Sequence, residues 1–214
     1  MYVDIDIVRH NLTDETGQKR EQILTLARER GILRPRDLEP LGIAGEYLNK
    51  LHNEGILERP GRGLYRLAHA KPGRFAQFAE VAKRTPQGVV CLLSALAFHG
   101  LTTENPHQIW LAIPSKARPP KIEYPPVRIV RYADTAQRFG IQAHRIDGVE
   151  VKIYSPAKTV ADCFKFRNQV GLDVALEALR DCWRKKLATS DELWKAAKVC
   201  RMTNVIRPYM EAVI

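Results

Sequence analysis

The chain has 214 residues, of which 45% are hydrophobic and 27% charged, as is ordinary for a globular protein with a buried core. No apolar run reaches the roughly 18 residues of a membrane span, and the first residues lack a basic stretch followed by an apolar one. These patterns exclude an integral membrane protein and predict a cytoplasmic location. Four widely spaced cysteines and six scattered histidines form no metal-binding pattern. We therefore expect buried, reduced thiols and no metal ion or other cofactor.

Positive charge is concentrated in the later part of the chain. The net charge is +10, and the predicted isoelectric point is about 9.6. Residues 1–70 carry 11 basic and 11 acidic side chains, whereas residues 71–214 carry 23 basic and 13 acidic ones. A basic excess of this size is typical of a partner for nucleic acid or for an acidic protein.

The first part of the chain predicts a DNA-binding domain. Residues 1–16 are polar and are expected to form an arm or an edge strand. Three short helices are then predicted, at residues 18–30, 35–41 and 45–54, and two strands follow, at residues 56–59 and 64–67. The strands flank Pro60-Gly61-Arg62-Gly63, a turn sequence that carries an arginine. Short helices joined by a tight turn and followed by such a hairpin are the parts of a winged helix-turn-helix, which we place at residues 17–70.

The third predicted helix and the hairpin carry the candidate contacts to duplex DNA. We predict contacts by four residues of this helix and three of the hairpin: Gly45, Asn49, Lys50, Asn53, Arg59, Arg62 and Arg66. Asparagine can pair with adenine and lysine with guanine or phosphate, while hairpin arginines suit phosphate or the minor groove. Tyr65 is expected to pack the hairpin onto the helices. The competing interpretation is an ordinary solvated polar surface.

The rest of the chain predicts an α+β architecture. A linker helix is expected within residues 71–84, followed by a mixed α/β domain at residues 85–214 that ends in a helical region. The expected strands are residues 108–113, 127–132, 141–145 and 149–154; the expected helices are residues 89–98, 156–166, 170–186, 190–200 and 204–214. Two helix starts are marked by capping residues, Ser155 before Pro156 and Thr189 with Glu192.

Three charged residues in the later part of the chain allow an enzymatic interpretation and a structural one. Asp134 followed by Glu150 and Lys152 matches the spacing of a metal-dependent nuclease core, in which carboxylates hold a divalent ion. The same residues 149–154 alternate as an ordinary amphipathic strand, with Glu150 and Lys152 facing outward. Lys158 and Asp162 likewise form an i,i+4 pair on a capped helix rather than a phosphate site. We therefore predict no active site and no catalytic residue.

Two motifs carry a resemblance to a known family. The first lies in the predicted winged domain and reads Gly42-Ile43-x-x-x-x-Leu48-x-Lys50-Leu51-x-x-x-Gly55-x-Leu57-x-Arg59-x-x-Arg62-Gly63-x-Tyr65. The second lies in the later domain and consists of Ser94-Ala95-Leu96 with His99-Gly100-Leu101, followed by Ser155-Pro156-x-Lys158-Thr159-x-x-Asp162. In these motifs the chain resembles the AbiEi family of bacterial antitoxins and transcriptional autorepressors of type IV toxin–antitoxin systems. It departs from the family pattern at Ala44, where a helix-capping serine is common, and at Lys50, where arginine is usual.

The resemblance implies a function that residue patterns alone do not reach. Such a protein represses its own operon by binding operator DNA, and it counters a nucleotidyltransferase-like toxin through its second domain, with direct contact to the toxin left open. It has no catalytic activity of its own. The alternatives are a stand-alone transcriptional regulator without a toxin and the metal-dependent nuclease described above.

Overall fold

The computed structural model describes residues 5–213, and their side chains from residue 16 onward. The chain divides into two compact units: an N-terminal unit of residues 1–80 with 146–149, and a C-terminal unit of residues 81–145 with 150–214. Both contain helices and strands, which confirms the predicted mixed α+β class. Within the described residues, no helix is long and apolar enough to cross a membrane.

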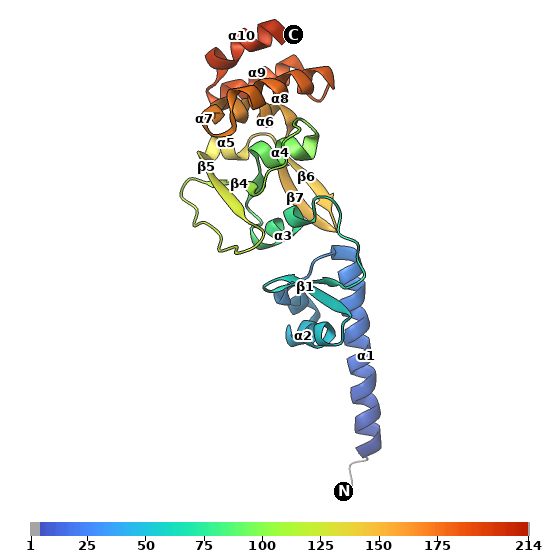
Figure 1. The fold of residues 1–214 in the computed structure, drawn as a ribbon. Coiled ribbons are helices and arrows are strands. Elements are labelled where there is room, and N and C mark those ends of the chain that lie inside the picture. Colours follow the sequence, from blue (N-terminus) through green and yellow to red (C-terminus); the bar gives the residue numbers. More distant parts are fainter. Residues whose placement is uncertain (1–4, 214) are drawn as a thin grey trace. The chain divides into compact units, whose positions relative to one another are not determined.

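The N-terminal unit contains three helical segments and a two-stranded sheet (Figure 1). Its elements are α1 (Ile5–Arg30), the 3-10 helix η1 (Pro35–Leu41), α2 (Glu46–Asn53), β1 (Leu57–Gly61) and β2 (Leu64–Leu67). The strands are antiparallel, and Leu33 forms an additional antiparallel bridge with Tyr65. Apolar side chains from every element form one core: Ile23, Ala27, Leu33, Leu38, Ile43, Leu48, Leu51, Leu57 and Tyr65.

The first helix is longer than predicted. An arm or edge strand was expected at residues 1–16, but α1 begins at Ile5, so this expectation is wrong for residues 5–16. Residues 1–4 lie outside the described part. The physical reason is that no proline interrupts residues 5–30, and the single internal Gly17 costs only about 1 kcal/mol of helix stability.

Glycines follow two helical segments of this unit, α1 and η1. Gly31 follows α1 with φ +67°, and Gly42 caps η1 with φ +65°. Both values lie in the left-handed region, which glycine adopts without the steric cost of a Cβ atom. In the hairpin, Gly63 has a positive φ of +70°, whereas Gly61 does not. Gly61 instead continues β1 and pairs with Leu64.

The C-terminal unit is built on a five-stranded sheet in the order β5-β4-β3-β7-β6. The boundary between the units falls inside α3 (Ala76–Arg84). The strands are β3 (Val89–Val90), β4 (Ile109–Pro114), β5 (Val127–Tyr132), β6 (Ile141–Ile146) and β7 (Val149–Tyr154). β4 runs antiparallel to β3 and parallel to β5, while β3 and β7 are parallel. The sheet is therefore mixed, with β5 and β6 at its edges.

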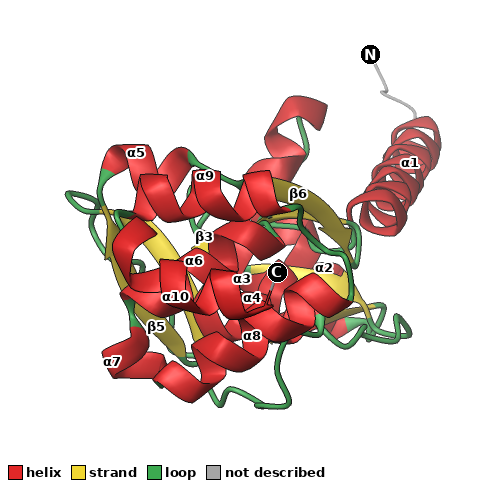
Figure 2. Ribbon diagram, turned by 90° about the horizontal axis from the view of Figure 1, so that it is seen from above, coloured by secondary structure: helices red, strands yellow, loops and turns green. Residues whose placement is uncertain are grey.

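Seven helices complete this part of the described chain: α4 (Leu92–His99), α5 (Asp134–Arg138), α6 (Pro156–Lys165), α7 (Arg167–Val170), α8 (Leu172–Arg184), α9 (Ser190–Cys200) and α10 (Thr203–Val213). α6 packs against α4, α8 and α9. The helices from α6 onward gather on one side of the strands (Figures 1 and 2). All four cysteines are buried and free, as predicted.

Both predicted helix starts are confirmed. The Ser155 hydroxyl accepts a hydrogen bond from the Lys158 backbone N–H, and Thr189 forms a capping box with Glu192. Two other expectations are wrong in part. A helix was expected over residues 89–98, but Val89 and Val90 form a strand, because these β-branched residues pair with β4 and β7. The helix expected over residues 170–186 is interrupted at Gly171, whose φ of +96° is not helical.

A fully buried ion pair lies at the centre of the C-terminal unit. Lys158 Nζ lies 2.5 Å from Asp162 Oδ2, and both side chains have no exposed surface. The ammonium group also lies over the rings of Tyr132 and Tyr154, 4.7 and 4.2 Å from their centroids. Cys200 Sγ donates to Asp162 Oδ1 at 3.2 Å. The predicted i,i+4 pair is thus confirmed, and these contacts replace the water that both charges lose on burial.

Candidate nucleic-acid interface

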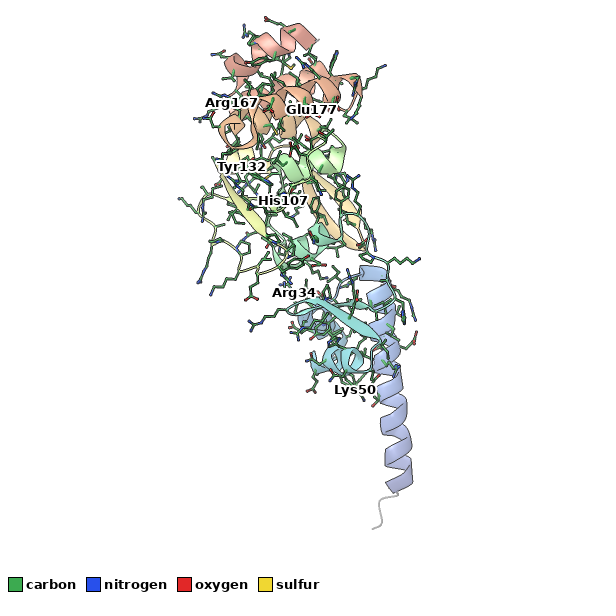
Figure 3. All side chains as sticks on the ribbon, viewed as in Figure 1. Arg34, Lys50, His107, Tyr132, Arg167 and Glu177 are labelled. Atoms are coloured by element: carbon green, nitrogen blue, oxygen red, sulfur yellow. The ribbon has the colours of Figure 1, made fainter. Side chains whose placement is uncertain are left out.

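α2 presents a polar face to solvent because its apolar residues point into the core. Leu48 and Leu51 are buried, whereas Asn49, Lys50 and Asn53 are exposed. Figure 3 shows the Lys50 side chain on this helix. Helical geometry puts Lys50 and Asn53, three positions apart, on the same face. The structure therefore places two of the predicted contact residues together on an accessible surface.

Asn49 is held by the hairpin. The Tyr65 hydroxyl donates a hydrogen bond of 2.6 Å to Asn49 Oδ1. Tyr65 is only 3% exposed and belongs to the N-terminal core, which confirms that it packs the hairpin onto the helices. Bidentate pairing with adenine needs both the amide oxygen and the amide nitrogen. Because the oxygen already accepts from Tyr65, Asn49 is better suited to joining α2 to β2 than to reading a base by itself.

Gly45 has an intramolecular reason to lack a side chain. A Cβ atom at this position would lie 2.7 Å from Pro35 Cβ, closer than real Cβ atoms approach. The absent side chain therefore allows the start of α2 to pack closely on the start of η1. This packing is enough to explain the glycine, so the predicted contact of Gly45 with DNA is not needed to account for it.

The hairpin presents two arginines near its tip. Arg59 and Arg62 are exposed, and the Arg59 guanidinium lies 5.7 Å from the centroid of the Tyr65 ring. Among the side chains that the structure describes, neither arginine has a carboxylate partner. Lys50 on α2 and Arg36 on η1 are exposed and have no such partner either. Arg36 was not predicted from the sequence, because a single basic residue in a short segment gives no signal of its exposure.

Arg66 differs from the other predicted hairpin contacts. Its guanidinium forms an ion pair with Glu58 on the neighbouring strand and lies 3.8 Å from the Glu80 carboxylate. The Arg66 side chain is only 18% exposed. Glu58 and Arg66 are directly opposite in the β1–β2 register, which explains the pair. This arrangement favours a structural role, so we leave Arg66 out of the contact set proposed below.

Two further arginines of α1 are neutralised within the unit. Arg20 pairs with Glu54 at 3.0 Å, and Arg28 pairs with Glu21 at 3.1 Å. Both pairs are solvent-exposed and contribute little stability. They lower the positive charge on α1, whereas the exposed cations on η1, α2 and the hairpin tip have no ion-pair partner among the described side chains.

The residues of the nuclease interpretation occupy ordinary positions. Asp134 begins α5, Glu150 is exposed on β7, and Lys152 Nζ donates to the Pro86 carbonyl at 3.0 Å. Within the described residues, no group of three histidine, cysteine, aspartate or glutamate side chains is arranged to hold a metal ion. The outward orientation predicted for Glu150 is confirmed, and the Lys152 ammonium group is hydrogen-bonded to a backbone carbonyl.

Comparisons with known proteins match part of the chain to one family and most of it to a solved structure of similar fold. No curated protein matches the chain in sequence. The crystal structure of the RV2827C protein from Mycobacterium tuberculosis is similar in fold, with a TM-score of 0.59 and 15% sequence identity over 90% of this chain and 77% of that one. Residues 21–68, the segment that contains α2 and the hairpin, match the family described as "Transcriptional regulator, AbiEi antitoxin", and this match confirms the resemblance predicted from the sequence.

Proposed function

We propose that this protein is a DNA-binding transcriptional regulator of the antitoxin type, whose N-terminal unit acts as a winged helix-turn-helix. The observation that carries the proposal is the exposed face of α2 beside an arginine-bearing hairpin, joined to it by the Tyr65–Asn49 hydrogen bond. The family match over residues 21–68 supports the same function.

In this proposal, α2 enters the major groove and the hairpin contacts the backbone beside it. An eight-residue helix is about 12 Å long, comparable to the width of the major groove. Lys50 and Asn53 face the base edges or the adjacent phosphates. Arg59 and Arg62 contact phosphates or the minor groove, as is common for a wing. Asn49 supports this surface by holding the hairpin against α2.

The target and the biological role follow from the family rather than from the geometry. We propose that the protein represses its own operon and counters a nucleotidyltransferase-like toxin encoded beside it. The motif from Ser155 to Asp162 in the C-terminal unit supports this assignment, because it accompanies the winged pattern in the AbiEi resemblance. We assign the protein no catalytic role.

Binding to the DNA upstream of its own gene tests the regulator function. Fluorescence anisotropy would compare that DNA with a scrambled duplex, using the wild type, Lys50→Ala with Asn53→Ala, and Arg62→Ala. We expect the α2 variant to lose about 1–3 kcal/mol per base-reading contact and to discriminate less between the two duplexes. The Arg62 variant should weaken binding to both. Lys195→Ala with Lys198→Ala, exposed on α9, is the matched control. Unchanged binding in the α2 and Arg62 variants would reject this placement.

Co-expression tests the antitoxin function. The protein should restore growth of cells in which the product of an adjacent nucleotidyltransferase-like gene arrests growth. The Arg62 variant should still protect, because protection is assigned to the C-terminal unit. An unrelated neighbouring gene, or failure to protect, would favour a stand-alone regulator.

A further inference from the structure

Part of the uncompensated positive charge of the C-terminal unit lies beside one edge of its sheet. β5 is an edge strand, and the long loop of residues 115–126 connects it to β4 (Figure 1). Five exposed basic residues lie on this strand and loop: Lys116, Arg118, Lys121, Arg128 and Arg131. We call this set the β5 basic surface. Glu123 is the one acidic residue within residues 115–132.

These charges are not neutralised within the described part of the protein. Arg131 donates to the backbone carbonyls of Ser115 and Ala117, at 2.6 and 2.9 Å, and these acceptors carry no formal charge. None of the five has an ion-pair partner among the described side chains. At the end of α8, by contrast, Arg184 and Lys185 share Asp181 as an ion-pair partner, each at 2.8 Å. The five cations of the β5 basic surface thus keep their charge, with one acidic residue, Glu123, in the same segment.

The loop is held in place at both ends. The two Arg131 hydrogen bonds fix its beginning, and Arg84 Nη1 donates to the Tyr124 carbonyl near its end at 2.7 Å. The Ile109 N–H also donates to the Pro126 carbonyl at 2.9 Å. A ligand that binds a loop already ordered in this way pays less conformational entropy than one that must order it.

Two planar side-chain groups, the Tyr124 ring and the Arg128 guanidinium, lie on the same loop and strand as these charges. Tyr124 is 59% exposed, more than any other large hydrophobic side chain of the described chain. The Arg128 guanidinium lies over the Trp110 ring, 4.1 Å from its centroid, and also donates to Gln169 at 3.3 Å. Its plane is therefore fixed while the side chain remains exposed. Four residues of chain span at most about 14 Å, so these two groups are within reach of neighbouring nucleotides.

We propose that the β5 basic surface binds single-stranded nucleic acid, with the lysines and arginines on phosphates and with bases stacked on Tyr124 and on the Arg128 guanidinium. Single strands offer unpaired bases whose faces stack on aromatic rings and on arginine planes, and their backbone follows a basic groove or edge. This activity is separate from duplex recognition by α2.

The exposed ring decides between the possible partners. Duplex DNA keeps its bases stacked inside the helix, so a duplex would contact the cations but would offer no unpaired base to the exposed part of the Tyr124 ring. An acidic protein would satisfy the charges, but it would not need a flat aromatic surface between them. A single strand uses both features together.

Binding of an oligouridine tests the proposal. The probe is fluorescein-labelled and about 15 nucleotides long, enough for one site of this kind; a duplex of the same length serves for comparison. In the full-length protein, Lys116→Glu with Arg118→Glu and Lys121→Glu should weaken oligouridine binding at least ten-fold. The slope of log affinity against log salt should fall by about 2, since each neutralised phosphate of a single strand contributes about 0.7.

Tyr124 variants separate stacking from charge. Tyr124→Ala should weaken oligouridine binding at least about five-fold, and Tyr124→Phe should retain it, because stacking needs the ring and not the hydroxyl. Neither should change binding to the duplex. Lys186→Glu with Lys195→Glu and Lys198→Glu is the matched control, since it reverses three exposed charges of the same unit; it should bind like the wild type.

Each of the following three results would overturn the proposal. If Tyr124→Ala binds oligouridine normally while the charge reversal weakens the duplex, the surface binds duplex phosphates. If the charge reversal affects neither nucleic acid, the surface is free for an acidic protein. Equal losses in the charge reversal and its control would show attraction by net charge alone. Circular dichroism of each variant distinguishes these results from loss of the fold.

Discussion

The Tyr65 hydroxyl of β2 donates a 2.6 Å hydrogen bond to Asn49 Oδ1 of α2, so one contact joins the proposed groove-reading helix to the proposed wing. Asn49 is the exposed partner, and Tyr65 is buried. The bond therefore connects the core of the N-terminal unit to the surface that is proposed to face DNA.

We predict that this bond is measurable as a coupling between the two residues. Tyr65→Phe removes only the hydroxyl and should lower the free energy of unfolding by about 1 kcal/mol. Asn49→Ala should add little in the Tyr65→Phe background, because the partner is already absent. Urea denaturation of the wild type, the two single variants and the double variant measures the coupling. Additive losses would show that the two residues act independently.

Arg62 and Arg66 should behave oppositely although both belong to the hairpin. Arg62→Ala removes an exposed cation and should lower the slope of log affinity for DNA against log salt by about 0.9, the contribution of one phosphate. Arg66→Ala should leave that slope nearly unchanged and instead destabilise the fold, because it leaves the buried Glu80 without its guanidinium neighbour. Salt titrations of binding and thermal denaturation distinguish the two. A lower slope in the Arg66 variant would restore this residue to the DNA contacts.

The buried Lys158–Asp162 pair should be costly to break and less costly to replace. Asp162→Asn leaves the Lys158 ammonium buried without its counter-charge and should destabilise the protein by about 3–5 kcal/mol. The double variant Lys158→Met with Asp162→Leu should recover most of that loss, because it removes both buried charges together. Chemical denaturation measures both. If Asp162→Asn costs less than about 1 kcal/mol, water or another group solvates Lys158.

His99 should make stability depend on pH on the acidic side of neutrality. Burial lowers the pKa of its imidazole below the ordinary value, and the nearby His144 acts in the same direction. The neutral ring donates from Nε2 to the Tyr154 carbonyl at 2.7 Å. The unfolded chain therefore binds the proton more readily than the folded one, so this contribution is complete above the unfolded pKa and declines as the pH falls through it.

The expected result is a free energy of unfolding that decreases between about pH 7 and about pH 5, with a smaller decrease in His99→Gln. Urea denaturation at several pH values measures the difference. His107→Gln is the control, because the His107 side chain is exposed. Parallel pH profiles for the wild type and His99→Gln would contradict the prediction.

Local signals in the sequence were sufficient for most elements. Ser155 and Thr189 marked two helix starts correctly, because a side-chain cap needs only residues a few positions away. The three-residue spacing of Leu48 and Leu51 is a local signal of the same kind, and both side chains lie on the buried face of α2. Gly31, Gly42 and Gly100 ended their helices for a local reason too, since each has a positive φ.

Features that depend on distant partners were not predictable in the same way. Val89 and Val90 read as the start of an apolar helix, and only pairing with β4 and β7 makes them a strand. In the sequence, Arg66 cannot be distinguished from the other hairpin arginines, because its contact with Glu80 depends on the folded structure. The hydrogen bond between Tyr65 and Asn49 spans 16 positions, so the sequence indicated that Tyr65 packs but not what its hydroxyl binds.

The two-residue strand β3 has a consequence for the order in which the chain folds. β3 pairs with β4 on one side, and Val90 pairs with Ile153 of β7, far along the sequence, on the other. Closing so long a loop costs entropy before its contacts form, so the middle of this sheet is assembled late. In the β1–β2 hairpin, by contrast, the paired residues are close in sequence, because one short turn joins the two strands. During synthesis, the N-terminal unit's hairpin can therefore form well before β7 has left the ribosome to complete the sheet.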